Sequence, residues 1–123
     1  MHPPRTALLI EDDAAIASLM LELLRGLGFA PRHATARARA VEMMKDGAPD
    51  LIVTDLITGS SASDAWIDLE RLREHAAGTP LLIVTGHASA LTEGPARGFP
   101  VLVKPFDLEE FEQAVRELFS GEG

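Results

Sequence analysis

The sequence predicts an α/β fold in which a parallel β-sheet is covered by helices on both faces. Three observations support this prediction. Short apolar runs alternate along the chain with segments whose apolar residues follow helical spacing. Several of these runs lack a polar residue at every second position, which indicates strands buried on both faces. The length of 123 residues suits one ordinary domain, so we expect a single domain over residues 1–123.

Five apolar runs are the expected strands. They lie at residues 7–10, 30–34, 51–54, 81–84 and 101–103, and the second of them is the weakest. Strands that alternate with helices in so short a chain favour a parallel sheet. Right-handed crossovers then leave few possible topologies.

The segments between the runs carry the marks of helix ends. Asp13 is the expected N-cap of the first helix, and Gly28 is its expected end. Thr35 could cap a second helix, which Gly47 would end, and Asp64 could cap a third.

The last helix has the clearest start signal. Asp107 and Glu110 form a capping-box pattern, and Phe106 and Phe111 occupy the two positions of a hydrophobic staple. Apolar residues continue from there at helical spacing, so we expect an amphipathic helix that packs on the sheet.

A full helix is not expected between the fourth and fifth strands. Gly86 and Gly94 bracket only residues 87–93, Pro95 follows directly, and Gly98 and Pro100 add further breaks. The segment should therefore form an irregular loop or one short helical turn.

Composition excludes several classes of protein. A formal net charge of −8 with scattered arginines disfavours nucleic-acid binding, which needs a basic face. The absence of cysteine rules out disulfides and thiolate metal sites, and it fits the cytoplasm. No apolar run approaches the roughly 20 residues of a membrane span. No signal peptide is visible at the start.

Residues that could work together in one site follow four of the expected strands. Because the carboxyl ends of parallel strands lie along one edge of the sheet, these residues should meet there. They are Glu11 and Asp12, then Asp55, then Thr85 and Gly86, and finally Lys104.

This residue set suits phosphoryl transfer. Clustered carboxylates repel one another, and magnesium, which prefers oxygen ligands, relieves that repulsion. A carboxylate can act as a nucleophile and form an aspartyl phosphate. The cationic Lys104 and the hydroxyl of Thr85 are the partner types that phosphoryl oxygens need. Lys104 would have to reach on the order of 10 Å if its strand lies two places from the third.

The matched strand ends resemble the receiver domain of bacterial two-component response regulators. The patterns are L-L-I-E-D-D, I-V-T-D-L, L-I-V-T-G and L-V-K-P-F, in that order. The resemblance covers nearly the whole chain. It implies a doubly wound, five-stranded sheet of strand order 2-1-3-4-5. The glycine and proline breaks between residues 86 and 100 would shorten the fourth helix or replace it by a loop.

The resemblance also implies a role for each site residue. Asp55 resembles the phospho-acceptor and a metal ligand. Asp12 would bind Mg²⁺ directly, Glu11 would do so through water, and the backbone carbonyl of Ile57 would complete the protein ligands. Thr85 resembles the switch hydroxyl, Gly86 a position kept small for phosphoryl access, and Lys104 the lysine that pairs with a phosphoryl oxygen. The bond between Lys104 and Pro105 could be cis.

The implied function is a phospho-accepting switch and not an enzyme that acts on other substrates. A histidine kinase or histidine phosphotransfer protein would donate the phosphoryl group, and the domain would catalyse only its own phosphorylation and dephosphorylation. The output would be a downstream protein partner, with no nucleic acid or membrane involved. We expect a monomer or a weak dimer in the cytoplasm.

Two positions depart from the family pattern. Gly59 stands where receivers usually carry a proline, and Val101 stands where they usually carry the switch aromatic. Phe99 is a doubtful substitute, because it would lie about 7 Å further from the site along the strand. These changes leave the acidic residues and the lysine intact. They make it doubtful that the domain signals through the usual coupled movement of the threonine and the switch aromatic.

Other interpretations remain open from sequence. The chain could be a pseudo-receiver that docks without phosphorylation, a phosphate sink, or the receiver of a hybrid histidine kinase, although its Met1 start disfavours excision from a longer chain. It could also be a small flavodoxin-like enzyme or nucleotide-binding protein. The absence of a G-x-G-x-x-G pattern weighs against that last class.

Overall fold

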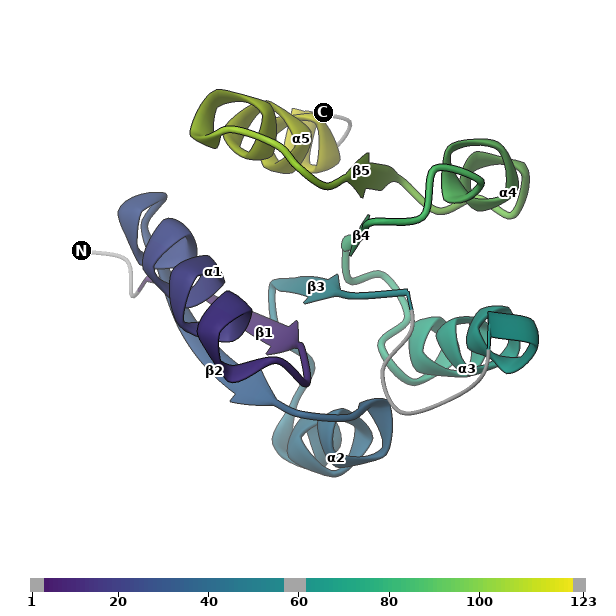
Figure 1. Ribbon diagram of the computed structural model, residues 1–123. Helices are drawn as coiled ribbons and strands as arrows, with labels where there is room; N and C mark the ends of the chain where they lie inside the picture. The colour runs from purple at the N-terminus through teal and green to yellow at the C-terminus, as the bar shows by residue number, and fades with distance from the viewer. Residues whose placement is uncertain (1–3, 57–61, 121–123) are drawn as a thin grey trace.

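A five-stranded parallel sheet forms the centre of the protein, as the sequence predicts. The computed structural model describes residues 4–56 and 62–120. The strand order is β2-β1-β3-β4-β5, and every neighbouring pair is parallel (Figure 1). The strands are β1 (Arg5–Ile10), β2 (Phe29–Ala34), β3 (Leu51–Thr54), β4 (Leu81–Thr85) and β5 (Val101–Val103).

Helices cover both faces of this sheet. Helices α1 and α5 lie on one face, and α2, α3 and α4 lie on the other (Figure 1). The helices are α1 (Ala14–Gly26), α2 (Arg37–Met43), α3 (Ala62–His75), α4 (Ala90–Ala96) and α5 (Leu108–Ser120), and a short 3₁₀ helix, Met44–Asp46, follows α2. Among the described residues, no helix is both long enough and apolar enough to cross a bilayer.

Alternate residues of the central strands feed two separate hydrophobic cores. Leu8 and Ile10 of β1 pack in the core under α2, α3 and α4, whereas Ala7 and Leu9 pack in the core under α1 and α5. Both sets are buried, so residues 7–10 of the strand have no exposed face. This explains why the sequence shows continuous apolar runs instead of an alternating pattern.

The predicted ends of α1 and α5 are confirmed. Asp13 caps α1 by accepting a hydrogen bond from the Ile16 backbone N–H at 3.0 Å. Asp107 accepts from the Glu110 N–H at 2.8 Å, and Glu110 accepts in return from the Asp107 N–H at 3.3 Å. The stacked rings of Phe106 and Phe111 form the predicted staple.

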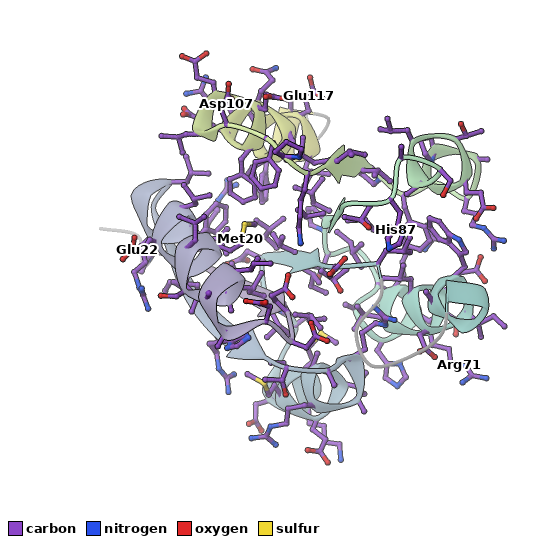
Figure 2. All side chains as sticks on the ribbon, viewed as in Figure 1. Met20, Glu22, Arg71, His87, Asp107 and Glu117 are labelled. Atoms are coloured by element: carbon purple, nitrogen blue, oxygen red, sulfur yellow. The ribbon has the colours of Figure 1, made fainter. Side chains whose placement is uncertain are left out.

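The side-chain directions on α1 follow its amphipathic pattern. Met20 points from α1 toward the sheet and is buried, whereas Glu22 points away into solvent (Figure 2). Gly28 has a positive φ of 95° directly after the C-cap, Leu27, a conformation that favours glycine, and it ends the helix as predicted.

Two predicted caps are wrong. Thr35 does not cap α2, because the N-cap is Ala36, which has an extended backbone and makes no side-chain capping bond. Arg37 and Ala40 in the first turn of this helix are buried, so packing against the rest of the protein stabilises the helix start in place of a capping hydroxyl. Asp64 does not cap α3, because the helix already begins at Ala62.

The fourth helix is shortened, as predicted, but it is longer than the loop or single turn expected, and its position differs from the prediction. It contains seven residues, Ala90–Ala96, and includes both Gly94 and Pro95. A residue before proline usually leaves the helical region because its Cβ clashes with the proline ring, and Gly94 has no Cβ. Gly98, with a φ of 83°, is the glycine that follows the helix end.

Gly94 also brings α4 close to the sheet. A Cβ at this position would lie 2.2 Å from Cγ2 of Val101 on β5 and 3.3 Å from the carbonyl oxygen of Phe99. The backbone N–H of Phe99 donates to the carbonyl of Gly94 at 2.8 Å. The glycine that looked like a helix breaker in the sequence is therefore the contact point between α4 and β5.

Candidate functional site

The carboxylates of Glu11, Asp12 and Asp55 converge at the carboxyl edge of the sheet. Each offers one oxygen atom, and these atoms all lie within 4.8 Å of one another. Backbone bonds continue beyond the strands and hold the acidic residues in place. The Glu11 N–H donates to the Ala34 carbonyl at 3.0 Å, and the Asp55 N–H donates to the Ile10 carbonyl at 3.2 Å.

Lys104 reaches this cluster from β5, which lies two strands away from β3. Its Nζ lies 3.4 Å from Oε1 of Glu11 and 3.8 Å from Oδ2 of Asp55. The backbone N–H of Lys104 donates to the Thr85 carbonyl at 2.7 Å, which extends the β4–β5 pairing by one residue. The peptide bond from Lys104 to Pro105 is cis. The ammonium group thus lies between two carboxylates of the cluster.

The protonation of Glu11 reflects its surroundings. Only 4% of this residue is exposed, and that burial raises its pKa. The Asp13 N–H, which donates to Oε2 at 3.1 Å, and the charge of Lys104 both lower the pKa, while the nearby Asp55 raises it again. The net pKa is raised, so the cluster favours either a proton or an additional cation.

The donor set fits a hard divalent cation. Carboxylate oxygens are the ligands that magnesium prefers, and it commonly uses one or two of them together with water and phosphate. Glu11, Asp12 and Asp55 could hold such an ion. Ile57, whose carbonyl is the further predicted ligand, lies outside the described residues, as does Gly59.

Thr85 ends β4 on the same edge of the sheet, and Gly86 follows it directly. Thr85 is fully buried, and its Oγ1 accepts a hydrogen bond from the His87 N–H at 3.2 Å. A Cβ at Gly86 would meet no atom within 4 Å, so the space beside this residue is open. His87 is exposed and lies in the connection from β4 to α4 (Figure 2).

Phe99 and Val101, the two residues considered for the position of the switch aromatic, differ in their surroundings. Phe99, which is 1% exposed, packs against Trp66 of α3 with 6.1 Å between ring centroids. The guanidinium of Arg73 lies 3.9 Å above the Phe99 ring. Phe99 is therefore held in the α3–α4 core, and half-buried Val101 has no ring that could swing.

Two side chains near the site were missed at the sequence level. Arg37 donates from Nη1 to the backbone carbonyl of Asp55 at 3.1 Å. His33 of β2 donates from Nε2 to the backbone carbonyl of Glu11 at 2.7 Å. Nothing in the sequence separates Arg37 from Arg39 in the stretch A-R-A-R-A, because the difference between them is burial in the folded protein.

Comparisons with known proteins point to one family. The family model described as response regulator receiver domain matches residues 7–116. A response regulator receiver protein from Anaeromyxobacter sp. (strain Fw109-5) is 35% identical over 93% of this chain and 45% of its own length. The sensor kinase CckA from Brucella abortus is 27% identical over 92% of this chain and 12% of its own length.

Solved structures give the same result. The crystal structure of a response regulator receiver protein from Sinorhizobium medicae has 29% identity and a TM-score of 0.81, with 98% of each chain covered. The chain spans less than half the length of the curated relatives described above.

Proposed function

Because this chain belongs to the response regulator receiver domain family of two-component systems, we propose that it is a phospho-accepting switch with Asp55 as the acceptor. One observation carries the proposal. Asp55 lies among the carboxylates of Glu11 and Asp12 and within 3.8 Å of the Lys104 ammonium group. This arrangement combines a nucleophile, oxygen ligands for a cation and a positive charge for the phosphoryl group.

The proposed reaction transfers a phosphoryl group from a phosphohistidine. A carboxylate oxygen of Asp55 forms a bond to phosphorus while the bond between phosphorus and the imidazole nitrogen of the donor breaks. The electron pair stays on that nitrogen. Magnesium held by Glu11, Asp12 and Asp55 would neutralise charge on the phosphoryl oxygens, and Lys104 would pair with one of them. The hydroxyl of Thr85, whose oxygen accepts from the His87 N–H, would donate its own hydrogen to another.

The proposed partners follow from the family. The donor is a histidine kinase or a histidine phosphotransfer protein, and the output is a contact with another protein. One relative is a sensor kinase that is much longer than this chain, so a receiver of this type also occurs within larger proteins. We propose that residues 1–123 act as one domain in either setting.

Intact mass spectrometry tests the acceptor. After incubation with Mg²⁺ and acetyl phosphate, the protein should gain the mass of one phosphoryl group, and Asp55→Asn should abolish the gain. Asp50→Asn is the matched control, because Asp50 precedes the same strand at the opposite edge of the sheet, where it accepts from the Thr6 N–H at 2.7 Å. Asp50→Asn should retain the mass gain.

The same experiment separates the alternative functions. A gain that persists in Asp55→Asn would move the acceptor to another residue. No gain in the folded wild-type protein, with either acetyl phosphate or a phosphorylated histidine kinase, would favour a docking module that works without phosphorylation.

A further inference from the structure

A buried arginine on α2 lies behind the proposed phospho-acceptor. Arg37 is the first residue of α2 and only 6% of it is exposed. Its guanidinium donates to the Asp55 carbonyl oxygen at 3.1 Å and lies 3.8 Å from Oδ2 of Asp68 on α3. One side chain thus connects α2, the end of β3 and α3.

We propose that Arg37 is a positioning residue that fixes the backbone of Asp55 and so aims its carboxylate at the cation and the phosphoryl group. This inference rests on the proposed function of Asp55. Arg37 would touch neither the cation nor the phosphoryl group, and it would act through the Asp55 peptide.

The hydrogen bonds at Asp55 support a fixed peptide. Its carbonyl oxygen also accepts from Oγ1 of Thr54 at 2.9 Å, so both lone pairs of that oxygen have a donor. Its N–H donates to the Ile10 carbonyl. Because both its N–H and its carbonyl are bonded, the Asp55 backbone is held in place, and this sets the direction in which its side chain leaves the chain. Residues that bond to metal ligands commonly orient them in this way.

The effect of Arg37 on cation binding distinguishes a positioning role from a purely electrostatic role and from a purely structural one. Burial lowers its pKa, while Asp68 and then Asp55 raise it, and a guanidinium stays protonated in proteins. If Arg37 acted on the site only through its positive charge, its removal would tighten cation binding, because less charge would repel the ion. If it positions Asp55, its removal should weaken cation binding. A purely structural role would change stability and leave cation affinity unchanged.

Three variants make the test. Arg37→Met keeps length and removes the donors, Arg37→Gln keeps a neutral donor, and Arg39→Met is the matched control on the same helix. Arg39 is exposed and pairs with Glu42 at the surface. For each variant we would measure the Mg²⁺ dissociation constant by calorimetry, the urea unfolding curve, and the rate of phosphorylation by acetyl phosphate at saturating Mg²⁺.

Arg37→Met should weaken Mg²⁺ binding and slow phosphorylation by about tenfold each, a typical effect of losing such a partner. Arg37→Gln should recover much of both losses, and Arg39→Met should match the wild type. Unchanged or tighter Mg²⁺ binding in Arg37→Met would overturn the proposal, as would failure of Arg37→Gln to recover either loss.

A second variant decides the case in which Arg37→Met does not fold. Asp68→Glu keeps the negative charge but displaces the carboxylate that anchors the guanidinium on α3, and it should weaken Mg²⁺ binding by a smaller factor than Arg37→Met. Unchanged Mg²⁺ affinity in Asp68→Glu would overturn the proposal. The Mg²⁺ dissociation constants decide the role of Arg37 even if the wild type takes up no phosphoryl group. Absence of phosphoryl uptake would overturn the proposed function, and this is a separate result.

Discussion

Substitution of Gly94 by alanine tests how closely α4 must approach the sheet. The new Cβ would lie 2.2 Å from Cγ2 of Val101, a separation that real Cβ atoms essentially never show. It would also lie 3.3 Å from the Phe99 carbonyl oxygen, which belongs to the backbone and has little freedom to move. Either Val101 must change its position or α4 must move away from β5.

The size of the effect follows from two opposing contributions. Alanine in place of glycine stabilises a helix by up to about 1 kcal/mol. Overpacking of a close contact costs about 1–3 kcal/mol, and a Cβ before Pro95 adds strain of its own. We therefore expect Gly94→Ala to lower the free energy of unfolding by about 1–2 kcal/mol. Gly26→Ala, the control at the end of α1, should not destabilise, because its Cβ would meet nothing within 4 Å.

A double-mutant cycle by urea unfolding checks the cause. Val101→Ala alone should cost about 1 kcal/mol, by analogy with other losses of buried methyl groups. In that background the clash with Cγ2 is absent, so Gly94→Ala should cost about 1 kcal/mol less than it does in the wild type. An equal cost in both backgrounds, or no cost in either, would refute the packing argument.

Two further predictions concern the acidic cluster. Asp12→Ala removes an exposed member of the carboxylate set and should weaken Mg²⁺ binding at least about tenfold without loss of folding, and an unchanged calorimetric titration would mean that the cation binds elsewhere. Because burial raises the pKa of Glu11, the folded state binds its proton more tightly than the unfolded state does, so the Glu11 contribution to stability grows as the pH falls through the range just above 4.5. Urea unfolding of metal-free wild type and Glu11→Gln should show this as a difference in slope between pH 7 and pH 4.5, and parallel curves would contradict it.

The sequence predicted the features that depend on nearby residues or on periodicity. The β3 run at residues 51–54 matches the observed strand, because a strand buried on both faces needs an unbroken apolar run. The caps at Asp13 and Asp107 were also found, since both bonds join residues three positions apart. The edge on which Asp55 and Lys104 meet followed from parallel topology alone.

Features that depend on distant contacts could not be predicted. Gly94 and Pro95 break helices by their local preferences, but contact with Val101 on β5 gives the glycine a role within α4. Arg37 is similar in sequence context to Arg39, and only the packing of α2 against α3 and β3 separates them. In both cases the deciding partner lies on a different element of the fold.

The two margins of the sheet have a consequence for self-association. β5 offers only three residues to a strand from another molecule. On β2, the carbonyl of Ala34 bonds toward the β1 side, so by alternation Pro31 faces the open side, where it has no N–H to donate. Both margins are therefore poor templates for growth by strand addition. Copies of this protein should accordingly associate through helices and loops, and not through a shared sheet.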